Sequence, residues 1–336
     1  MRKFPSLLAV VLLVACSNSH PLGRGPSPLP PGPLGDTWIG DGAKWEQEIV
    51  PGPVPRYFAA LAYDAPRHMY VLFGGQAGAV TMDDTWTWDG AKWTQMSPAH
   101  KPPPRRNAAM AYDPSHQAVV MHGGLIPDQA EGFESSDTWT WNGSDWTEVS
   151  VESKAIGPRQ GLRMVTAGNG VLLFGGNYAN LRYYADVWTW DGAGWSRIDR
   201  NPTPPGRGNA AITWDPLDSA LFVYGGAGIN SQAGPGALGK QLNDVWVLRN
   251  GAWTQLRADG PPTLANGNAF WNQKTNRLVV VFGIKCPDPT NEDWVWAGAS
   301  WTQSANVAIP ARWGAAIAED PGGNVVVFGG SDEPGC

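Results

Sequence analysis

The chain contains 336 residues, among them 42 glycines, 30 prolines and 19 tryptophans, and its formal charge is -6. Glycine and proline together exceed a fifth of the chain, which argues against long helices and favours short strands joined by turns. The many tryptophans supply the apolar area that a disordered chain lacks. Because the charge is acidic, the sequence gives no basic footprint for nucleic acid, and no nucleic-acid partner is expected.

Residues 1–15 have the pattern of a secretion signal. A basic start, Met-Arg-Lys, precedes an apolar run that ends at Ala15 and is too short to span a bilayer. The ending Leu13-Val14-Ala15-Cys16 resembles the lipobox of bacterial lipoproteins. That resemblance implies cleavage before Cys16 and acylation of this cysteine, and several acyl chains would anchor the protein stably. The alternative is an ordinary cleaved signal with an incidental cysteine.

Residues 16–35 predict a tether. After Cys16 the segment is rich in proline with glycine and serine between, a composition that favours an extended, solvated chain. At about 3 Å per residue it would reach up to ~60 Å. With Cys16 used for lipid, Cys286 and Cys336 remain, and in an oxidising envelope such an even pair is expected to form one disulfide.

The body, residues 36–336, contains a unit that recurs six times. Its clearest copies are D-T-W-T-W-D-G-A-K-W-T-Q from Asp84, D-T-W-T-W-N-G-S-D-W-T-E from Asp137 and D-V-W-T-W-D-G-A-G-W-S-R from Asp186. Each copy closes on a tryptophan, and these are Trp45, Trp93, Trp146, Trp195, Trp253 and Trp301, spaced 48 to 58 residues apart. A repeat of this length is typical of a propeller.

A second unit lies between these copies, and it predicts two further strands per period. It starts with an alanine-rich segment and continues with an apolar run that ends in Gly-Gly, as in Gly123-Gly124; the fifth copy has Gly283-Ile284 instead. Strands A and B come from this unit. Strands C and D come from the Thr/Trp unit, with Asp-Gly or Asn-Gly as the hairpin turn between them.

The pattern resembles the kelch repeat family, whose relatives include galactose oxidase. The resemblance implies a β-propeller with four-stranded blades around a central channel. Because the body starts with strands C and D and ends with strands A and B, the two ends are expected to complete one blade together. The sequence therefore predicts an all-β, six-bladed propeller, with blades at about 55–98, 104–150, 158–199, 205–257, 262–304 and 311–330 plus 36–49.

The D-to-A and B-to-C loops of such a propeller emerge on one face, where we expect any binding site. An arginine opens strand A in five copies, with Asn266 in the fifth copy; the arginines are Arg56, Arg105, Arg159, Arg207 and Arg312. Around the channel mouth they could bind a carboxylate bidentately. Alternatively, each could bond backbone or the aspartate that opens strand C, since residues common to all repeats usually serve packing. Trp313 follows Arg312 and is a further candidate.

Loop residues that break the repeat are better binding candidates. The second B-to-C loop carries Glu131 and Glu134, and the third carries Arg182, Tyr183 and Tyr184, an aromatic and cationic group suited to a sugar or peptide. Any of these loops could equally be solvated surface. No metal or cofactor is expected, because the five histidines lack ligand spacing, and His122 is interpreted as a core residue. Galactose oxidase's copper chemistry is not expected either, and no catalytic residue is assigned.

The first functional hypothesis is a lipid-anchored, non-catalytic binding module of a bacterial cell envelope, on the outer rather than the inner membrane. A monomeric body would bind a protein or a glycan through the B-to-C and D-to-A loops. One alternative is an envelope enzyme resembling the kelch-type sialic-acid mutarotases, with Glu131 or Glu134 as the base. Another is a purely structural module. The fold alone does not choose among these hypotheses.

Overall fold

The computed structural model describes residues 31–127, 133–149, 156–198, 203–228, 240–256, 264–298, 300–304 and 308–335. The chain divides into a unit of residues 1–30 and a unit of residues 31–336, and the described residues all belong to the second. The predicted signal, Cys16 and most of the predicted tether therefore lie outside the described residues. Within these ranges no helix is long and apolar enough to cross a bilayer.

The described part of the chain is built from four-stranded antiparallel sheets, as the repeat predicts. The first sheet contains β3 (Ala60–Asp64), β4 (Met69–Phe73), β7 (Thr85–Trp88) and β8 (Trp93–Gln95). The second contains β9 (Ala109–Asp113), β10 (Ala118–His122), β13 (Thr138–Trp141) and β14 (Trp146–Val149). The third contains β15 (Arg163–Ala167), β16 (Gly170–Phe174), β19 (Val187–Trp190) and β20 (Trp195–Arg197). One 3-10 turn, η1 (Ala65–Arg67), joins β3 to β4.

Three more sheets follow the same order. The fourth contains β22 (Ala211–Asp215), β23 (Ala220–Tyr224), β26 (Val245–Arg249) and β27 (Ala252–Leu256). The fifth contains β28 (Asn268–Asn272), β29 (Arg277–Lys285), β30 (Asp288–Trp296) and β31 (Trp301–Gln303). The sixth joins both ends of the body and contains β32 (Ala316–Glu319), β33 (Val325–Phe328), β1 (Thr37–Gly40) and β2 (Trp45–Glu48).

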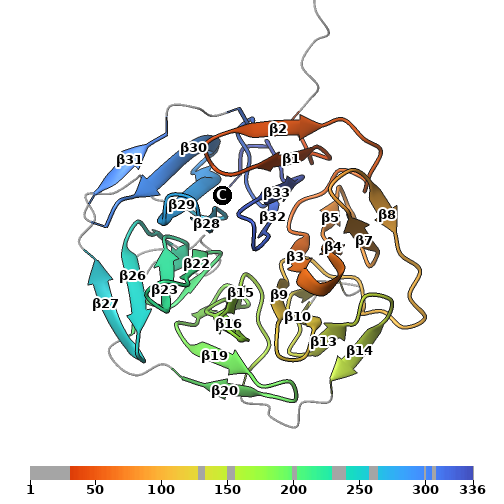
Figure 1. Ribbon diagram of the computed structural model, residues 1–336, viewed down its shortest axis with the longest axis horizontal. Coiled ribbons are helices and arrows are strands. Elements are labelled where there is room, and N and C mark those ends of the chain that lie inside the picture. Colours follow the sequence, from red (N-terminus) through yellow and green to blue (C-terminus); the bar gives the residue numbers. More distant parts are fainter. Residues whose placement is uncertain are drawn as a thin grey trace, which may run out of the picture. The chain divides into compact units, whose positions relative to one another are not determined.

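The sheets stand side by side with their first strands innermost, as Figure 1 shows. Each inner strand contacts the inner strands of two neighbouring sheets, for example β15 with β9 and β22. The fourth strand of each sheet lies at the periphery. This is the arrangement of a β-propeller, and it confirms the predicted all-β propeller class.

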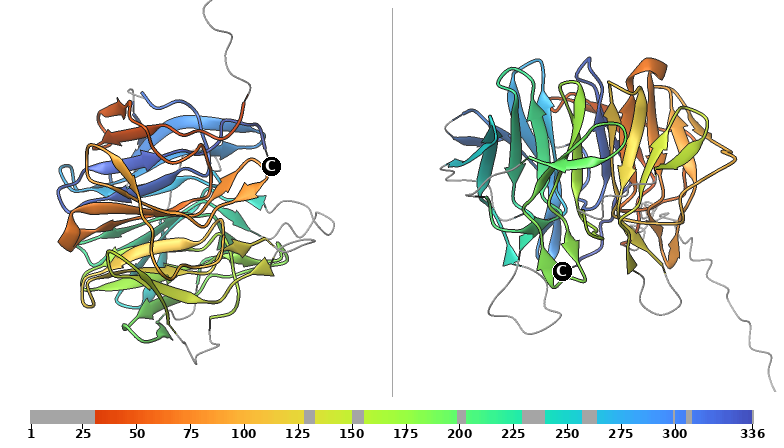
Figure 2. Two further views of the ribbon diagram at one scale, coloured as in Figure 1. Left: turned by 90° about the vertical axis from the view of Figure 1, so that its right-hand side faces the viewer. Right: turned by 90° about the horizontal axis from the view of Figure 1, so that it is seen from below.

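Short strands extend the B-to-C connections beyond the sheets, joined in the fourth sheet by β21 of the D-to-A connection, and form what we call the crown. The crown consists of β5 (Gln76–Ala77), β6 (Val80–Thr81), β11 (Leu125–Ile126), β12 (Phe133–Glu134), β17 (Asn177–Tyr178), β18 (Arg182–Tyr183), β21 (Arg207–Gly208), β24 (Ala227–Gly228) and β25 (Lys240–Gln241). In the right-hand view of Figure 2 these short strands lie along the lower edge of the molecule. In the fifth sheet β29 and β30 themselves extend to a tight turn, so the crown has no separate hairpin there.

The C-to-D hairpins follow directly from their turn residues. In the first sheet the side-chain oxygen Oδ1 of Asp89 accepts hydrogen bonds from the N–H groups of Ala91 and Lys92, both at 2.9 Å. Gly90 between them has a φ of 94°, in the left-handed region that glycine enters without strain. Asn142 and Gly143 repeat the arrangement in the second sheet, so the Asp-Gly and Asn-Gly pairs act as predicted.

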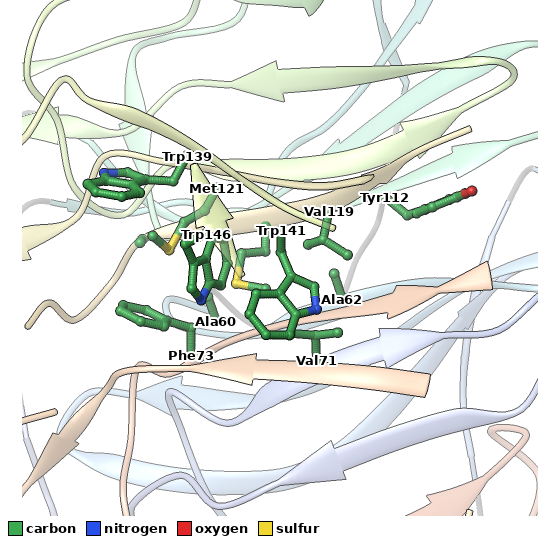
Figure 3. Close-up of a cluster of buried hydrophobic side chains, with 12 residues drawn as sticks. Ala60, Ala62, Val71, Phe73, Tyr112, Val119, Met121, Trp139, Trp141 and Trp146 are labelled. Carbon is green, nitrogen blue, oxygen red and sulfur yellow. The ribbon is translucent and has the colours of Figure 1, made fainter. Parts of the chain in front are cut away.

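The core lies between neighbouring sheets and uses the tryptophans of strands C and D. Figure 3 shows this between the first two sheets, where Trp141 and Trp146 pack with Val71 and Phe73. The ring centroids of Trp141 and Trp146 are 5.4 Å apart, as are those of Phe73 and Trp146. The repeated tryptophans are therefore packing residues and not an exposed platform for sugars.

A hydrogen bond between sheets recurs with this packing. The indole N–H of the strand D tryptophan donates to the threonine that opens strand C of the preceding sheet, as in Trp93 to Thr37 (2.8 Å), Trp146 to Thr85 (2.9 Å) and Trp195 to Thr138 (3.1 Å). Valine occupies the threonine position in the third sheet, at Val187, and the indole nitrogen of Trp253 is buried without a hydrogen-bond partner.

Asp293 takes the threonine position in the fifth sheet. Its side chain is fully buried, and neither carboxyl oxygen has a hydrogen-bond partner within the described ranges. Burial raises the pKa of Asp293 to about 7, and the nearby indole N–H of Trp45 offsets that rise only in part. A carboxyl group thus stands where the repeat normally supplies a neutral acceptor.

We expect Asp293→Thr to stabilise the protein, because threonine supplies the repeat's own acceptor for Trp45. A carboxyl whose pKa is raised on folding contributes stability below its unfolded pKa of about 3.9, and this contribution is lost as pH rises through the folded value. The gain in the free energy of unfolding should therefore be larger at pH 8, about 1–3 kcal/mol, than at pH 5. Urea unfolding at both pH values measures it.

Val187→Thr is the matched control, since it offers a neutral acceptor to the indole of Trp253. It should raise the free energy of unfolding by about 0.5–1.5 kcal/mol, equally at pH 5 and pH 8. A gain for Asp293→Thr that does not change between the two pH values would show that ionisation of Asp293 is not the cause.

Candidate functional site

The five arginines that open strand A are buried and fully engaged. Each is at most 1% exposed. In the second sheet the Nη1 and Nη2 atoms of Arg105 lie 2.5 and 2.7 Å from the two carboxylate oxygens of Asp137. Nη1 also donates to the carbonyl of Gly123 at 3.0 Å, and Nε donates to that of Pro103 at 3.2 Å. We call this arrangement the arginine clasp.

The same clasp occurs in five sheets. Its pairs are Arg56–Asp84, Arg105–Asp137, Arg159–Asp186, Arg207–Asp244 and Arg312–Asp36. Burial acts to raise the pKa of Asp137, but the hydrogen bonds and the charge of Arg105 outweigh it and hold the pKa below its ordinary value. A carboxylate ligand could bind these guanidinium groups only by displacing an aspartate. The geometry therefore supports the packing interpretation and not a ligand-binding ring.

The fifth sheet departs from the clasp, and the sequence interpretation of this copy needs correction. Leu264 occupies the arginine position, whereas Asn266 has a φ of 54° and matches the left-handed residue two positions later, such as Asn107. Glu292 stands in the aspartate position and pairs with Lys285 at 2.5 Å. Lysine and glutamate from β29 and β30 thus replace the arginine and aspartate.

The Gly-Gly ending of strand B joins neighbouring sheets. The N–H of Gly75 donates to the carbonyl of Arg105 in the next sheet at 2.9 Å, and a Cβ on Gly74 would lie 2.5 Å from the same oxygen. In the fifth sheet Phe282 and Gly283 fill these two positions, with φ of 52° and 119°, and Gly283 donates to Arg312 at 3.0 Å. The pair is therefore Phe282-Gly283 and not Gly283-Ile284, because a bulge shifts the register.

A ring of backbone hydrogen bonds surrounds the mouth of the channel. Each member has positive φ and donates its N–H to the equivalent carbonyl of a neighbouring sheet, and the bonds run from Phe58 to Gly314, Gly314 to Asn266, Asn266 to Asn209, Asn209 to Gly161, Gly161 to Asn107 and Asn107 to Phe58. Their lengths range from 2.7 to 3.3 Å. The series returns to its starting residue.

Three aromatic residues cluster where the ring passes from the sixth sheet to the first. Phe58 has a φ of 56°, which is strained for a bulky side chain. Its ring lies 5.2 Å from that of Tyr57 and 5.3 Å from that of Trp313. Trp313 precedes β32 and is not part of this inner strand, and its indole donates to the carbonyl of Glu333 at 2.8 Å. Trp313 therefore stands beside the channel mouth, as expected.

The inner strands enclose a channel with a cavity volume of about 440 Å³. Its wall comes from β3, β9, β15, β22, β28 and β32. The first residue of the inner strand is alanine in four sheets, whereas it is Arg163 in β15 and Asn268 in β28. Sequence analysis did not single out Arg163, although an arginine in an otherwise alanine position was a visible signal.

Among the ionisable residues that line this channel, Arg163 and Glu319 lie at opposite ends of the inner strands. Arg163 forms one long hydrogen bond, 3.3 Å to the carbonyl of Leu162, and no ion pair with any described residue. Burial lowers its pKa to about 10. At the other end of the inner strands, burial raises the pKa of Glu319 to about 8. Hydrogen bonds with Gln273 and the backbone of Trp271 act to lower this pKa but offset the rise only in part.

The predicted loop residues lie in the crown. Glu134 accepts hydrogen bonds from Gln160 at 3.1 Å and from the N–H of Ala179 at 2.8 Å, so it joins the hairpins of the second and third sheets. Glu131, the other candidate base, lies outside the described residues. Among the described residues Glu134 bonds Gln160 and Ala179 and not a clasp arginine, so the structure gives no support to the predicted carboxylate and arginine pair.

The tyrosines of the third hairpin differ in the solvent exposure of their side chains. The ring of Tyr184 already holds two cation–π contacts, with the guanidinium carbons of Arg159 at 4.0 Å and Arg182 at 4.9 Å. Tyr183 is half-buried, and burial raises its pKa. Arg182 is exposed. Tyr178, at 44% exposed, is the more open ring of this hairpin.

The histidine and cysteine predictions can be followed in part. His122 is buried, with Nδ1 2.9 Å from the hydroxyl of Thr138, and burial lowers its pKa to about 3, which fits a neutral core residue. The described ranges contain no group of side chains that could hold a metal ion. Cys286 is disulfide-bonded, and its expected partner Cys336 lies outside the described residues. The adjacent Gly335 donates its N–H to the carbonyl of Pro287 at 2.9 Å.

Comparison with known proteins supports a kelch-like propeller. The solved structure of YjhT, a kelch-type β-propeller, superposes with a TM-score of 0.65 at 16% identity and covers 84% of this chain and 96% of that chain. Adagio-like protein 3 of Oryza sativa subsp. japonica is 25% identical over 183 residues. That match covers 52% of this chain and only 27% of the rice protein. No family model matches the chain.

Breaking the clasp should cost more than removing an exposed arginine. We expect Arg105→Leu, which introduces the residue found at Leu264, to lower the free energy of unfolding by about 3–5 kcal/mol, because Asp137 is left buried without its partner. Urea unfolding at pH 7 measures the loss. The pair's contribution should also decrease as pH falls below the unfolded pKa of about 3.9 and be lost as pH falls through the lowered pKa of Asp137 in the folded state, where the carboxylate becomes protonated.

Arg106→Leu is the matched control. Arg106 is the next residue and makes a side-chain hydrogen bond of 3.2 Å to Gln76 on a half-buried surface. Its loss should cost no more than about 1 kcal/mol. Equal losses for the two variants would contradict a structural role specific to the clasp.

Proposed function

We propose that this chain is a lipid-anchored binding module of a bacterial cell envelope, with a six-bladed, closed kelch-like propeller as its body. The six sheets are the blades, and the sixth blade is completed by strands from both ends. Pairing of β1 with β33, in the register Trp38 opposite Val327, supports this closure. The ring of backbone hydrogen bonds at the channel mouth supports it independently.

The crown is the binding surface, and its exposed apolar side chains are the observation that carries this proposal. Val80, Phe133, Tyr178 and Leu181 are 60%, 52%, 44% and 68% exposed, and all lie in the B-to-C hairpins of the first three blades. Large apolar side chains gathered on one face mark an interaction site more often than scattered ones do. A protein or a glycan that covers them is the partner.

The crown is also held in place before a partner binds. Glu134 connects the second and third hairpins, and Arg106 donates to the side chain of Gln76 at 3.2 Å, which ties the second blade to the first hairpin. In the fourth blade Gln241 donates to the carbonyl of Ile284 at 2.9 Å. Such preorganisation reduces the entropy cost of association.

The catalytic alternative has less support. It requires a carboxylate placed beside the arginine ring, but the clasp arginines are each paired with a structural aspartate, and Glu134 bonds Gln160 and Ala179. A binding function without catalysis therefore fits the described geometry better than an enzyme that resembles the mutarotases.

The crown prediction is tested by cosedimentation of the full chain with isolated envelopes. We expect Phe133→Ser and Leu181→Ser together to weaken binding at least tenfold, because both remove apolar area from the contact. Leu217→Ser is the matched control: Leu217 is 67% exposed but lies in an A-to-B turn, at the opposite end of the inner strand. An equal loss in the control would contradict the crown as the binding surface. Pretreating the envelopes with protease or with glycosidases separates a protein partner from a glycan.

Lipid anchoring is tested separately by growth with an alkyne-labelled palmitate. We expect the wild-type chain to incorporate the label and to sediment with membranes, because acyl chains bury their methylene groups in the bilayer. Cys16→Ser should lose the label and remain in the soluble fraction, whereas Cys286→Ser should keep the label. An unlabelled wild-type chain, or label that persists in Cys16→Ser, would contradict the proposed anchor.

A further inference from the structure

Arg163 is half-buried, and it differs from the clasp arginines because it has no counter-charge among the described residues. Each clasp guanidinium forms two parallel bonds with an aspartate, whereas Arg163 has only the 3.3 Å bond to Leu162 and no ion pair in the described part of the chain. A guanidinium that is partly withdrawn from water is stabilised by an accompanying anion. The channel therefore contains an unbalanced positive charge.

The neighbours of Arg163 leave space in front of this charge. Its strand, β15, contacts β9 and β22, and the residues that open those strands are Ala109 and Ala211. Small side chains at these points leave the channel open, and its volume of about 440 Å³ is within the roughly 300–1,000 Å³ of small-molecule sites. The aromatic rings of Trp214 and Trp271 also line the channel.

We propose that the channel is a binding site for a small molecule that bears a carboxylate or phosphate group, with Arg163 as the residue that receives the anion. The planar guanidinium matches either oxyanion bidentately. The alanine-lined wall accommodates the rest of the ligand. This site is separate from the crown, so it goes beyond the proposed partner-binding function and can fail or hold independently of it.

The acidic groups of the channel do not oppose this assignment. Glu319 closes β32 and Asp320 follows it, so both carboxyl groups lie at the far end of the inner strands from Arg163. Because burial raises the pKa of Glu319 to about 8, this carboxyl is largely protonated at neutral pH. The oxyanion therefore meets one positive group and no fixed negative charge at the Arg163 end among the lining residues.

The test is a thermal-unfolding titration of the full chain in a mild non-ionic detergent at constant ionic strength. The probes are acetate, glucuronate, inorganic phosphate and glucose 6-phosphate, with chloride and glucose as controls. At about a hundred times the dissociation constant, a ligand should raise Tm by several degrees. A rise with the carboxylates alone or with the phosphates alone identifies the oxyanion. Tryptophan fluorescence provides a second readout, through Trp214 and Trp271.

Variants decide whether Arg163 receives the anion. Arg163→Ala introduces the residue found in four other inner strands, so it should fold; its Tm should rise without ligand, and its response to the probes should be lost. Arg163→Lys should bind at least tenfold more weakly, because it keeps the charge and loses the planar fork. Arg277→Ala is the control, since Arg277 is exposed at the start of β29 and should leave the response unchanged.

Three outcomes would overturn the proposal: no probe raises Tm or changes fluorescence, Arg163→Ala keeps the response, or glucose and chloride act as strongly as the oxyanions. Loss of crown binding in Phe133→Ser with an intact oxyanion response would support the channel site, since the two surfaces are then independent.

Discussion

The pair of a buried arginine and an aspartate is the interaction on which five of the six sheets depend. The loop that enters strand A has only short pairings over its last residues, such as the bridge of Arg106 with Leu125. The guanidinium connects this loop to the end of strand B and to the start of strand C. Arg105 does this through Gly123 and Asp137. Its backbone carbonyl accepts from Gly75 of the neighbouring sheet. One residue therefore fixes both the inside of its own blade and the joint to the next blade.

The fifth and sixth sheets differ from the others in this arginine and aspartate pair. In the fifth sheet Leu264 cannot form an ion pair, and there the Lys285–Glu292 contact and the longer strands β29 and β30 connect the end of strand B to the start of strand C. In the sixth sheet the pair is intact but joins Arg312 to Asp36, which are 276 residues apart. This contact brings the two ends of the body together, and a buried ion pair between them opposes fraying of either end.

Much of the fold could be predicted from the sequence because each copy of the repeat contains the same turn residues and the same pattern of apolar residues. Asp-Gly turns, apolar runs before Gly-Gly and alternating Thr and Trp each have one structural solution, and their period indicates a propeller. The fifth copy was assigned incorrectly because a bulge after Val281 moves Phe282 into a glycine position, which no propensity indicates. The ring of backbone hydrogen bonds at the channel mouth and the burial of the clasp arginines depend on contacts between distant segments. A single sequence does not show such contacts.

The same reasoning explains why the best site candidates were the hardest to find. The arginines that recur in five copies suggested a binding ring, yet residues that recur usually serve packing, and the donors of these arginines are occupied within the fold. Arg163 stands where four of its counterparts are alanine, and among the described residues it has a hydrogen bond to the carbonyl of Leu162 but no acidic partner to balance its charge. A charged residue that forms no ion pair within the fold lowers the stability of a repeat protein. A bound anionic ligand therefore accounts for an arginine at position 163 better than packing does.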